Sequence, residues 1–215
     1  MTKNRMILPF LFLFGTNIHS HIVCYKDDMQ KNDFRCMAFV TGNPDKAAEV
    51  QELLPGIRII AVDMPEIQEV DSKKIIAAKV RTAFEHYSDG PIIVDDTGFY
   101  MDCLNGQLPG PLVKWFLKTI TNIGLVNMAQ SMGNMRAKAM TVIGYATSPT
   151  DIIFFEGEMP GTIVMPEGGP KGPGWSSILI PDGYNEIYYT MDVTKKNAMS
   201  MRSQAIKKLK KFLTH

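Results

Sequence analysis

The 215-residue sequence has few cysteines, no excess of either charge and no long apolar run, and each absence excludes a class of protein. Its three cysteines are an odd number without CxxC spacing, so they indicate neither a zinc site nor a disulfide framework. We expect free thiols in a reducing cytosol. An apolar run from Ile7 to Phe14 has eight residues and contains Pro9, whereas a membrane-spanning helix needs about 20. With 23 basic and 22 acidic residues, the chain is not a wholly basic binder of polyanions.

The composition, 45% hydrophobic and 21% charged, is typical of a globular chain, and the length predicts one domain with a core that needs no disulfide or metal. The charge is unevenly distributed. Residues 37–193 carry nineteen acidic and eleven basic groups, whereas residues 194–215 carry seven basic groups and no acidic one. An acidic body with a basic end could bring a metal and an anionic ligand together, or could be an ordinary solvated surface. A nucleic-acid or membrane surface on the last helix is a third interpretation, which the lack of interleaved aromatic residues disfavours.

The first 36 residues differ from the rest. Lys3 and Arg5 precede the apolar run as in a secretory signal, but no small-residue cleavage site follows. We therefore predict that residues 1–36 form an extension, either poorly ordered or packed on the body, and that the protein is cytoplasmic. Secretion is the alternative.

From Met37 onward, apolar runs alternate with helical periodicity. We expect strands at 37–40, 58–62, 91–94, 137–146, 152–156, 162–165 and 178–180, and helices at 44–54, 73–87, 112–119, 125–132 and 198–213. The three strands between 137 and 165 are expected to be antiparallel. This order predicts an α/β protein with a mixed central β-sheet and flanking helices.

A first group of polar residues, Thr41 to Lys46, lies between a predicted strand and a predicted helix. Asn43 is a favourable N-cap and Pro44 suits the first helical position. The start of such a helix offers free N–H groups and a positive dipole end to a phosphate, and Lys46 could reach the same phosphate. A P-loop is excluded because GxxxxGK[ST] is absent. An ordinary capped helix is the alternative.

Two further groups lie near strand ends. Asp95 and Asp96 follow an apolar run, and adjacent buried carboxylates need compensation by a divalent metal or by solvent. A solvated Asp-Gly turn is the alternative. In the segment from Lys171 to Arg202, Trp175 could stack on a base and Arg202 could hydrogen-bond a base oxygen. A core tryptophan and a surface helix would explain the same residues.

Taken in order, six motifs resemble those of the inosine triphosphate pyrophosphatase family, in its eukaryotic-like branch. They are T-G-N-P-D-K (41–46), V-D-D-T-G (94–98), L-P-G-P-L-V-K-W-F-L (108–117), G-W (174–175), P-D-G-Y (181–184) and K-N-A-M-S-M-R (196–202). The resemblance covers residues 37 to about 213. It implies a single nucleoside triphosphate pyrophosphatase domain over 37–215, with two lobes around a nucleotide cleft, that forms a homodimer. From the last helix itself, which lacks interleaved aromatic residues, we expect no nucleic-acid and no membrane partner.

The resemblance also implies an activity: Mg²⁺-dependent hydrolysis of non-standard purine nucleoside triphosphates (ITP, dITP, XTP) to monophosphate and pyrophosphate, with Mn²⁺ able to replace Mg²⁺. Asp96 and Lys46 would be catalytic, and Glu66 and Asp96 would bind the metal. The substrate-binding residues implied in the same way are Thr41, Gly42, Asn43, Pro44, Asp45, Lys46, Lys79, Asp96, Thr97, Lys114, Pro173, Gly174, Trp175, Ser176, Lys196, Met201 and Arg202.

The part of the site that reads the base departs from the family pattern. The family has an aromatic-Gly-aromatic-Asp-Pro run where this chain has residues 173–177, and Ser-His-Arg where it has Ser200-Met201-Arg202. Ser176 supplies no carboxylate and Met201 no hydrogen-bond donor. We therefore predict pyrophosphatase chemistry with relaxed or altered base selectivity. The alternative is a non-catalytic descendant that binds nucleotide or a partner protein, which the intact Lys46, Glu66 and Asp96 oppose.

Overall fold

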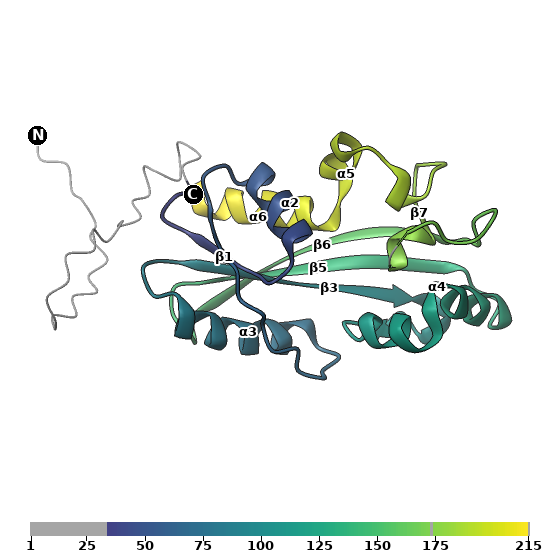
Figure 1. Cartoon of the computed structure of the whole chain (residues 1–215), viewed down its shortest axis with the longest axis horizontal. Coiled ribbons are helices and arrows are strands. Elements are labelled where there is room, and N and C mark those ends of the chain that lie inside the picture. The colour runs from purple at the N-terminus through teal and green to yellow at the C-terminus, as the bar shows by residue number, and fades with distance from the viewer. Residues whose placement is uncertain (1–33, 173, 215) are drawn as a thin grey trace, which may run out of the picture.

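A computed structural model describes residues 34–172 and 174–214 and arranges them around one mixed seven-stranded sheet (Figure 1). The strands are β1 (Ala38–Val40), β2 (Arg58–Ile60), β3 (Ile92–Met101), β4 (Pro109–Gly110), β5 (Arg136–Ala146), β6 (Ile152–Ile163) and β7 (Leu179–Pro181). Their order is β2-β1-β3-β5-β6-β7, with β4 paired to β3. The pairs β1–β2 and β1–β3 are parallel, and the other pairs are antiparallel. The predicted α/β fold with a mixed sheet is confirmed.

Five α-helices of the described part of the chain flank this sheet. They are α2 (Pro44–Leu53), α3 (Ser72–His86), α4 (Val113–Ser131), α5 (Val193–Met199) and α6 (Met201–Thr214), with short 3₁₀ helices η1 (Asp102–Leu104), η2 (Trp175–Ser177) and η3 (Tyr188–Thr190). None of the described helices is both long and apolar enough to cross a membrane. The predictions for the apolar run near the N-terminus and for Pro173 lie outside the described residues.

The starts of α2 and α3 follow from their capping residues. The Asn43 side chain accepts hydrogen bonds from the backbone N–H groups of Asp45 and Lys46, at 2.9 and 3.2 Å, and Pro44 occupies the first helical turn. Asp71 accepts from the backbone N–H of Lys73 at 2.9 Å. Each cap satisfies N–H groups that have no partner within the helix.

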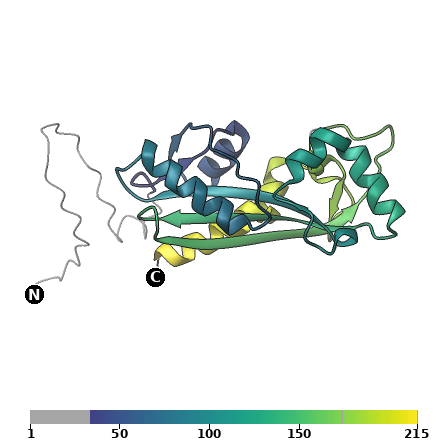
Figure 2. The same cartoon turned by 90° about the horizontal axis from the view of Figure 1, so that it is seen from below.

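Alternation along β1 and β3 places successive side chains on opposite faces of the sheet, and a separate core forms on each face. Phe39 and Ile93 pack beneath α2 and α6, whereas Val40 and Val94 pack against α3. Figures 1 and 2 show these helices on the two faces at one end of the sheet. The two layers of side chains form the first lobe.

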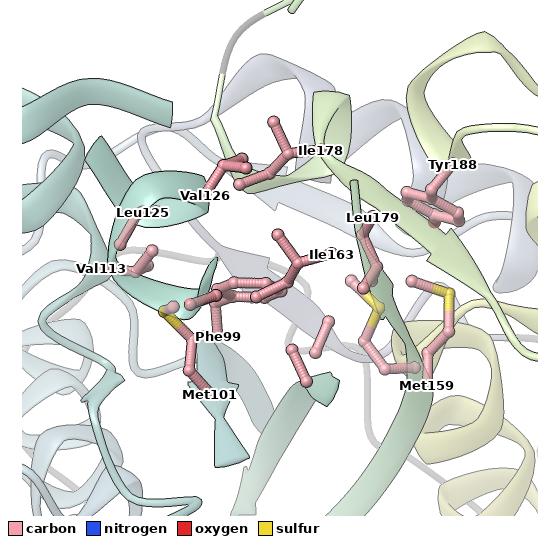
Figure 3. Close-up of a cluster of buried hydrophobic side chains, with 14 of the residues drawn as sticks. Phe99, Met101, Val113, Leu125, Val126, Met159, Ile163, Ile178, Leu179 and Tyr188 are labelled. Atoms are coloured by element: carbon pink, nitrogen blue, oxygen red, sulfur yellow. The ribbon is translucent and has the colours of Figure 1, made fainter. Parts of the chain in front are cut away.

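The other end of the same strands forms the second lobe. Its core is centred on Phe99 of β3 and includes buried residues of α4, β6 and β7 (Figure 3). Other large side chains of this core include Met101, Val113, Leu125, Val126, Met159, Ile163, Ile178, Leu179 and Tyr188. Because β3, β5 and β6 pass through both lobes, the residues in the middle of these strands lie between the two cores.

Two strands are longer than predicted. The prediction ended one strand at Val94 because Asp95 to Gly98 resembles a turn, but β3 continues to Met101, paired with β5 throughout. The predicted strands 152–156 and 162–165 are likewise one strand, β6. Gly157, in the gap between the two predicted strands, lies against α6, where a Cβ would overlap the backbone oxygen of Met201. Close packing of α6 therefore explains this glycine.

Two helical predictions also change. The predicted helices 112–119 and 125–132 are one kinked helix, α4, with Thr121 in a non-helical conformation. The predicted last helix, 198–213, is divided at Ser200 into α5 and α6. The prediction of free thiols holds for Cys103 and is wrong for Cys36, which is disulfide-bonded.

Candidate active site

A cavity of about 390 Å³ lies between the first lobe and the start of α4 and is lined mainly by polar side chains. Its lining comes from the end of β1, the start of α2, the connection that follows β2, α3, β3 and the start of α4. The lining residues are Val40, Thr41, Gly42, Asn43, Pro44, Asp45, Lys46, Asp63, Met64, Glu66, Lys79, Asp95 and Lys114. The volume is in the range of small-molecule sites. Three lysines from three helices converge on it.

The start of α2 differs from the predicted anion site in one respect. The backbone N–H groups of Asp45 and Lys46 are already bonded to the Asn43 side chain, and the N–H of Asn43 donates to Oγ1 of Thr41 at 3.1 Å. The expectation of free N–H groups therefore fails for these three residues. What the segment offers an anion is the positive end of the helix and the Lys46 ammonium.

Asp95 is the centre of a buried ion cluster. Its side chain is only 3% exposed, and its Oδ1 accepts a hydrogen bond from Nζ of Lys46 at 2.9 Å. Its Oδ2 accepts from Nε and Nη2 of Arg202, at 3.1 and 2.8 Å. Arg202 also donates to Glu49 of α2 and, at 3.3 Å, to Oγ1 of Thr97. The cluster joins α2, β3 and α6.

Burial and charge have opposite effects on the pKa of Asp95. Burial alone would raise the pKa of this carboxyl, but Lys46, Arg202 and Lys79 outweigh it and hold the pKa well below its usual range. The pKa of Lys46 is lowered by burial, which Asp95 only partly opposes. Burial would also lower the pKa of Arg202, but Asp95 and Glu49 raise it. Asp95 is therefore a fixed anion and Arg202 a fixed cation.

Asp96, the next residue on β3, points to a different set of partners. Nζ of Lys79 donates to Oδ1 of Asp96 at 2.9 Å and to the backbone oxygen of Asp95 at 3.0 Å. Oγ of Ser72 donates to Oδ2 of Asp96 at 3.3 Å, and the Tyr100 hydroxyl lies 3.3 Å from the same Ser72 oxygen. Both carboxylate oxygens of Asp96 are thus held in place.

Glu66 and Lys114 line the same cavity and come from different elements of the fold. Nζ of Lys114, at the start of α4, donates to Oε2 of Glu66 at 2.7 Å. Their side chains are 51% and 70% exposed, so water reaches both. The structure therefore brings these two predicted site residues together in an exposed ion pair.

The predicted base-recognition residues lie elsewhere. Trp175 stacks nearly parallel to Phe99 and to Tyr188, with ring centroids 5.5 and 5.8 Å away. Nζ of Lys196 donates to the backbone oxygen of Tyr189 at 2.8 Å. Met201 is 4% exposed and belongs to the core of the second lobe. None of these residues lines the cavity, and the donors of Arg202 are used within the ion cluster.

Some residues of the site were not identified from the sequence. The sequence predicts a role for Asp96 but none for Asp95. Alternation along a strand directs adjacent side chains to different sides, so the two aspartates have different partners. Glu49 follows Lys46 by three residues on α2, a spacing that places both on one helix face. Ser72 and Tyr100 carry no sequence signal for a contact with Asp96.

The described residues contain no group of three or more His, Cys, Asp or Glu side chains that could hold a metal ion by themselves. Mg²⁺ does not require such a group, because it commonly binds one or two carboxylates together with substrate phosphates. Glu66 and Asp96 supply hard oxygen donors of this kind, and both are balanced here by lysines. The chemistry of these two carboxylates suits Mg²⁺, but only Glu66 lines the cavity, and Asp96 is joined to the lining through Lys79.

Comparisons with known proteins identify the family. The Ham1 family matches residues 37–212. "Inosine triphosphate pyrophosphatase 2" of Trypanosoma cruzi is 38% identical over 178 residues, which cover 81% of this chain and 90% of that protein. "Inosine triphosphate pyrophosphatase" of Saccharomyces cerevisiae is 38% identical over 189 residues, which cover 82% and 95%.

Solved structures show the same fold. A HAM1 protein from Coxiella burnetii is similar with a TM-score of 0.67 and 25% identity, over 83% of this chain and 98% of that one. The Staphylococcus aureus Ham1 protein gives a TM-score of 0.67 at 21% identity, over 82% and 97%. These matches confirm the resemblance that the six motifs indicated: the chain belongs to the Ham1 family, together with these inosine triphosphate pyrophosphatases.

Proposed function

We propose that this protein hydrolyses the triphosphates of non-standard purine nucleosides, such as ITP, dITP and XTP, to the monophosphate and pyrophosphate. One observation carries the proposal: Lys46, Lys79 and Lys114 converge on one cavity, where Lys114 pairs with Glu66, and Lys79 pairs with Asp96, which does not itself line the cavity. A triphosphate needs several cations to balance its charge, and acidic groups to hold a metal beside it. The relatives named above as inosine triphosphate pyrophosphatases support the substrate class.

The chemistry assigned to Asp96 is that of a positioned base. Lys79 and Ser72 fix its two oxygens, so the carboxylate can accept a proton from a water molecule that attacks the α-phosphorus. The bond to the bridging oxygen then breaks in line with the attack, and pyrophosphate leaves. Lys46 neutralises the charge that develops on the phosphates. A positioned base contributes about 10²–10⁴-fold to such a rate.

The cofactor proposed is Mg²⁺, with Mn²⁺ able to replace it. Glu66 and Asp96 would hold the ion, which supplies positive charge to the triphosphate and to departing pyrophosphate. In the free protein, Lys114 and Lys79 balance these two carboxylates. When phosphates bind to the lysines, the carboxylates lose part of that compensation, which favours a divalent cation beside them.

We also propose that base selectivity is relaxed or altered. Met201 is buried and has no hydrogen-bond donor, and Arg202 already donates to Asp95 and Glu49. A pocket with fewer donors aimed at the base discriminates less between purines. Measured kcat/KM values for ITP, XTP, ATP, GTP and UTP test this proposal, and a strong preference for ITP over ATP would contradict it.

The activity itself is tested by pyrophosphate release in the presence of Mg²⁺. Wild-type protein is expected to release pyrophosphate from ITP, and Asp96→Asn to lose this activity while it still folds. Asp151→Asn, a change in the exposed turn between β5 and β6, is the matched control and keeps the activity. A folded wild type without turnover on any of the five nucleotides would instead favour the non-catalytic nucleotide-binding or partner-binding alternative.

The assembly and compartment follow as further proposals. We propose a cytoplasmic homodimer with no nucleic-acid or membrane partner. Trp115, Ile120 and Ile123 of α4 are 46%, 36% and 48% exposed, and large apolar side chains gathered on one helix favour association with a second copy. Light scattering coupled to gel filtration tests the dimer, and a monomer at micromolar concentration would contradict it.

A further inference from the structure

Asn122 of α4 joins that helix to the segment that carries Trp175. Its Nδ2 lies 3.1 Å from the backbone oxygen of Gly174, 2.6 Å from Oγ of Ser177 and 3.3 Å from the backbone oxygen of Gly172. An amide has two hydrogens, so these three acceptors share them. Ser177 in turn donates to the Gly174 oxygen at 2.9 Å. In Figure 2, α4 lies next to the segment that leads into β7.

The backbone of α4 is distorted at this point. Thr121 has φ 61° and ψ −179°, in a region that is essentially restricted to glycine. A β-branched residue stays in such a conformation only when its surroundings enforce it. The break interrupts α4 directly before Asn122, whose hydrogen bonds to the Gly174–Ser177 segment supply such a constraint.

The segment that Asn122 holds is short, and Asn122 is one of several contacts that fix it. Gly174 has φ 69°, a conformation that costs glycine little, and Trp175 begins the single 3₁₀ turn η2. The Trp175 ring is partly buried and stacks with Phe99 and Tyr188. A shift of this segment would therefore move the aromatic ring that the sequence predicts to contact the base.

We propose that Asn122 is a positioning residue for base selection: its side-chain amide fixes the Gly174–Ser177 segment and, through it, the orientation of Trp175. The inference rests on the proposed function, because base selection matters only if a nucleotide binds. Asn122 itself contacts neither the cavity nor the predicted metal ligands. Its substitution therefore changes the ratio of kcat/KM between bases and leaves kcat for the preferred nucleotide nearly unchanged.

The test has one readout that does not depend on activity. The chain has two tryptophans, and Trp115→Phe removes the exposed one, so the fluorescence reports Trp175 alone. In this background, Asn122→Asp replaces the amide NH₂ group by a carboxylate oxygen that faces the same three oxygen atoms. Asn122→Ala removes the amide altogether. Both variants are expected to raise acrylamide quenching and to move the emission maximum to longer wavelength. Asn134→Asp, which retains the oxygen that accepts from the Arg136 N–H, is the control and changes neither.

The second readout is the ITP to ATP ratio of kcat/KM, measured with Trp115 in place. It is expected to change by up to about tenfold in the Asn122 variants, because the loss of a hydrogen bond sets an upper limit on an effect that reaches the base only through Trp175. The ratio is expected to stay unchanged in Asn134→Asp. Circular dichroism confirms that each variant is folded. If quenching rises but the ratio is unchanged in an active enzyme, Asn122 is only structural and the inference is wrong. Unchanged quenching in both Asn122 variants also overturns it.

Failure of the proposed function is distinguishable from failure of this inference. If the wild type releases no pyrophosphate from any nucleotide, the hydrolase proposal fails. The dissociation constants of ITP and ATP, measured by titration of Trp175 fluorescence, are then compared in place of kcat/KM. An Asn122-dependent change in their ratio then supports the inference. Equal ratios in the wild type and both Asn122 variants overturn it.

Discussion

Nε and Nη2 of Arg202 both donate hydrogen bonds to Oδ2 of Asp95, at 3.1 and 2.8 Å. The two residues are 107 positions apart, and their side chains are 7% and 3% exposed. The first turn of α6 is thereby attached to the middle of β3. Lys46 donates to the other oxygen of Asp95, so one buried carboxylate links α6 to α2, the helix that begins at the cavity.

The first prediction concerns the stability that this contact provides. Arg202→Met keeps the volume of the side chain but leaves Asp95 and Glu49 without their buried cation. Removal of one partner of a buried ion pair costs about 3–5 kcal/mol, so the free energy of unfolding should fall by that amount. Urea denaturation followed by circular dichroism measures it.

Arg136→Met is the matched control. Arg136 also forms a two-pronged pair with an aspartate, Asp182, but these side chains are 45% and 48% exposed. Exposed pairs contribute about 0–1 kcal/mol. Equal losses in the two variants would contradict the importance assigned to burial of the Arg202 pair.

The second prediction concerns Glu66. Glu66→Gln keeps the shape of the side chain but removes a charged metal ligand, so the Mg²⁺ concentration needed for half-maximal pyrophosphate release should rise severalfold. Stability should change by less than about 1 kcal/mol, because the pair with Lys114 is exposed. A Mg²⁺ titration together with a thermal melt separates the two effects. An unchanged Mg²⁺ requirement would remove Glu66 from the metal site.

The third prediction concerns alkaline pH. Burial raises the pKa of Tyr188 to about 12, whereas a tyrosine in the unfolded chain ionises near pH 10. As the pH rises, the tyrosine therefore loses its proton first in the unfolded chain. The contribution of Tyr188 to the free energy of unfolding is fully present below about pH 10 and is lost as the pH approaches 12. The loss attributable to Tyr188 is up to about 2–3 kcal/mol.

Denaturation of the wild type and of Tyr188→Phe between pH 8 and about pH 12 measures this difference. The variant keeps the stacked ring but has no titrating hydroxyl, so its stability should decline less. Tyr189→Phe, at the exposed neighbouring position, should follow the wild type. Parallel curves for the wild type and Tyr188→Phe would show that Tyr188 does not contribute.

The fourth prediction concerns the contact between β6 and α6. A Cβ at Gly157 would overlap the backbone oxygen of Met201, so Gly157→Ala should displace the start of α6 and with it Arg202. Overpacking of this kind costs about 1–3 kcal/mol, and turnover should fall as well, because the Arg202 cluster holds Lys46.

Gly133→Ala provides the comparison. No atom lies within 4 Å of the added Cβ, but the residue has φ 72°, so the cost is that of a left-handed backbone, about 1–2 kcal/mol. Turnover should stay at the wild-type value in this variant. Equal effects on turnover would show that packing at Gly157 does not control the site.

Local signals were sufficient to predict part of the fold and of the site. Asn43 and Pro44 mark the start of α2, and the structure confirms both the cap and the first residue. The Asp95-Asp96 pair also indicates that carboxylates need compensation here, but not which groups supply it. For the start of α2, the physical cause lies within a few residues of the signal.

Compensation from distant residues could not be predicted in this way. β3 continues through two adjacent aspartates because Lys46, Lys79 and Arg202 from three helices neutralise them. Arg202 lies in a lysine-rich segment that resembles a solvated helix, yet its side chain is buried. A pattern within one element does not show which charge from another element will meet it.

The continuity of β3, β5 and β6 has a mechanical consequence. The two lobes share these strands, and β3 and β5 stay paired from Ile92 and Ala146 to Met101 and Ala137. Rotation of one lobe against the other would have to bend three hydrogen-bonded strands together, which makes the floor of the cleft stiff. No strand of the described residues pairs with the connection 61–71, which supplies Asp63, Met64 and Glu66 to the cavity lining, and the Glu66–Lys114 pair beside it is exposed. We therefore expect this border, rather than the sheet, to adjust when a ligand enters.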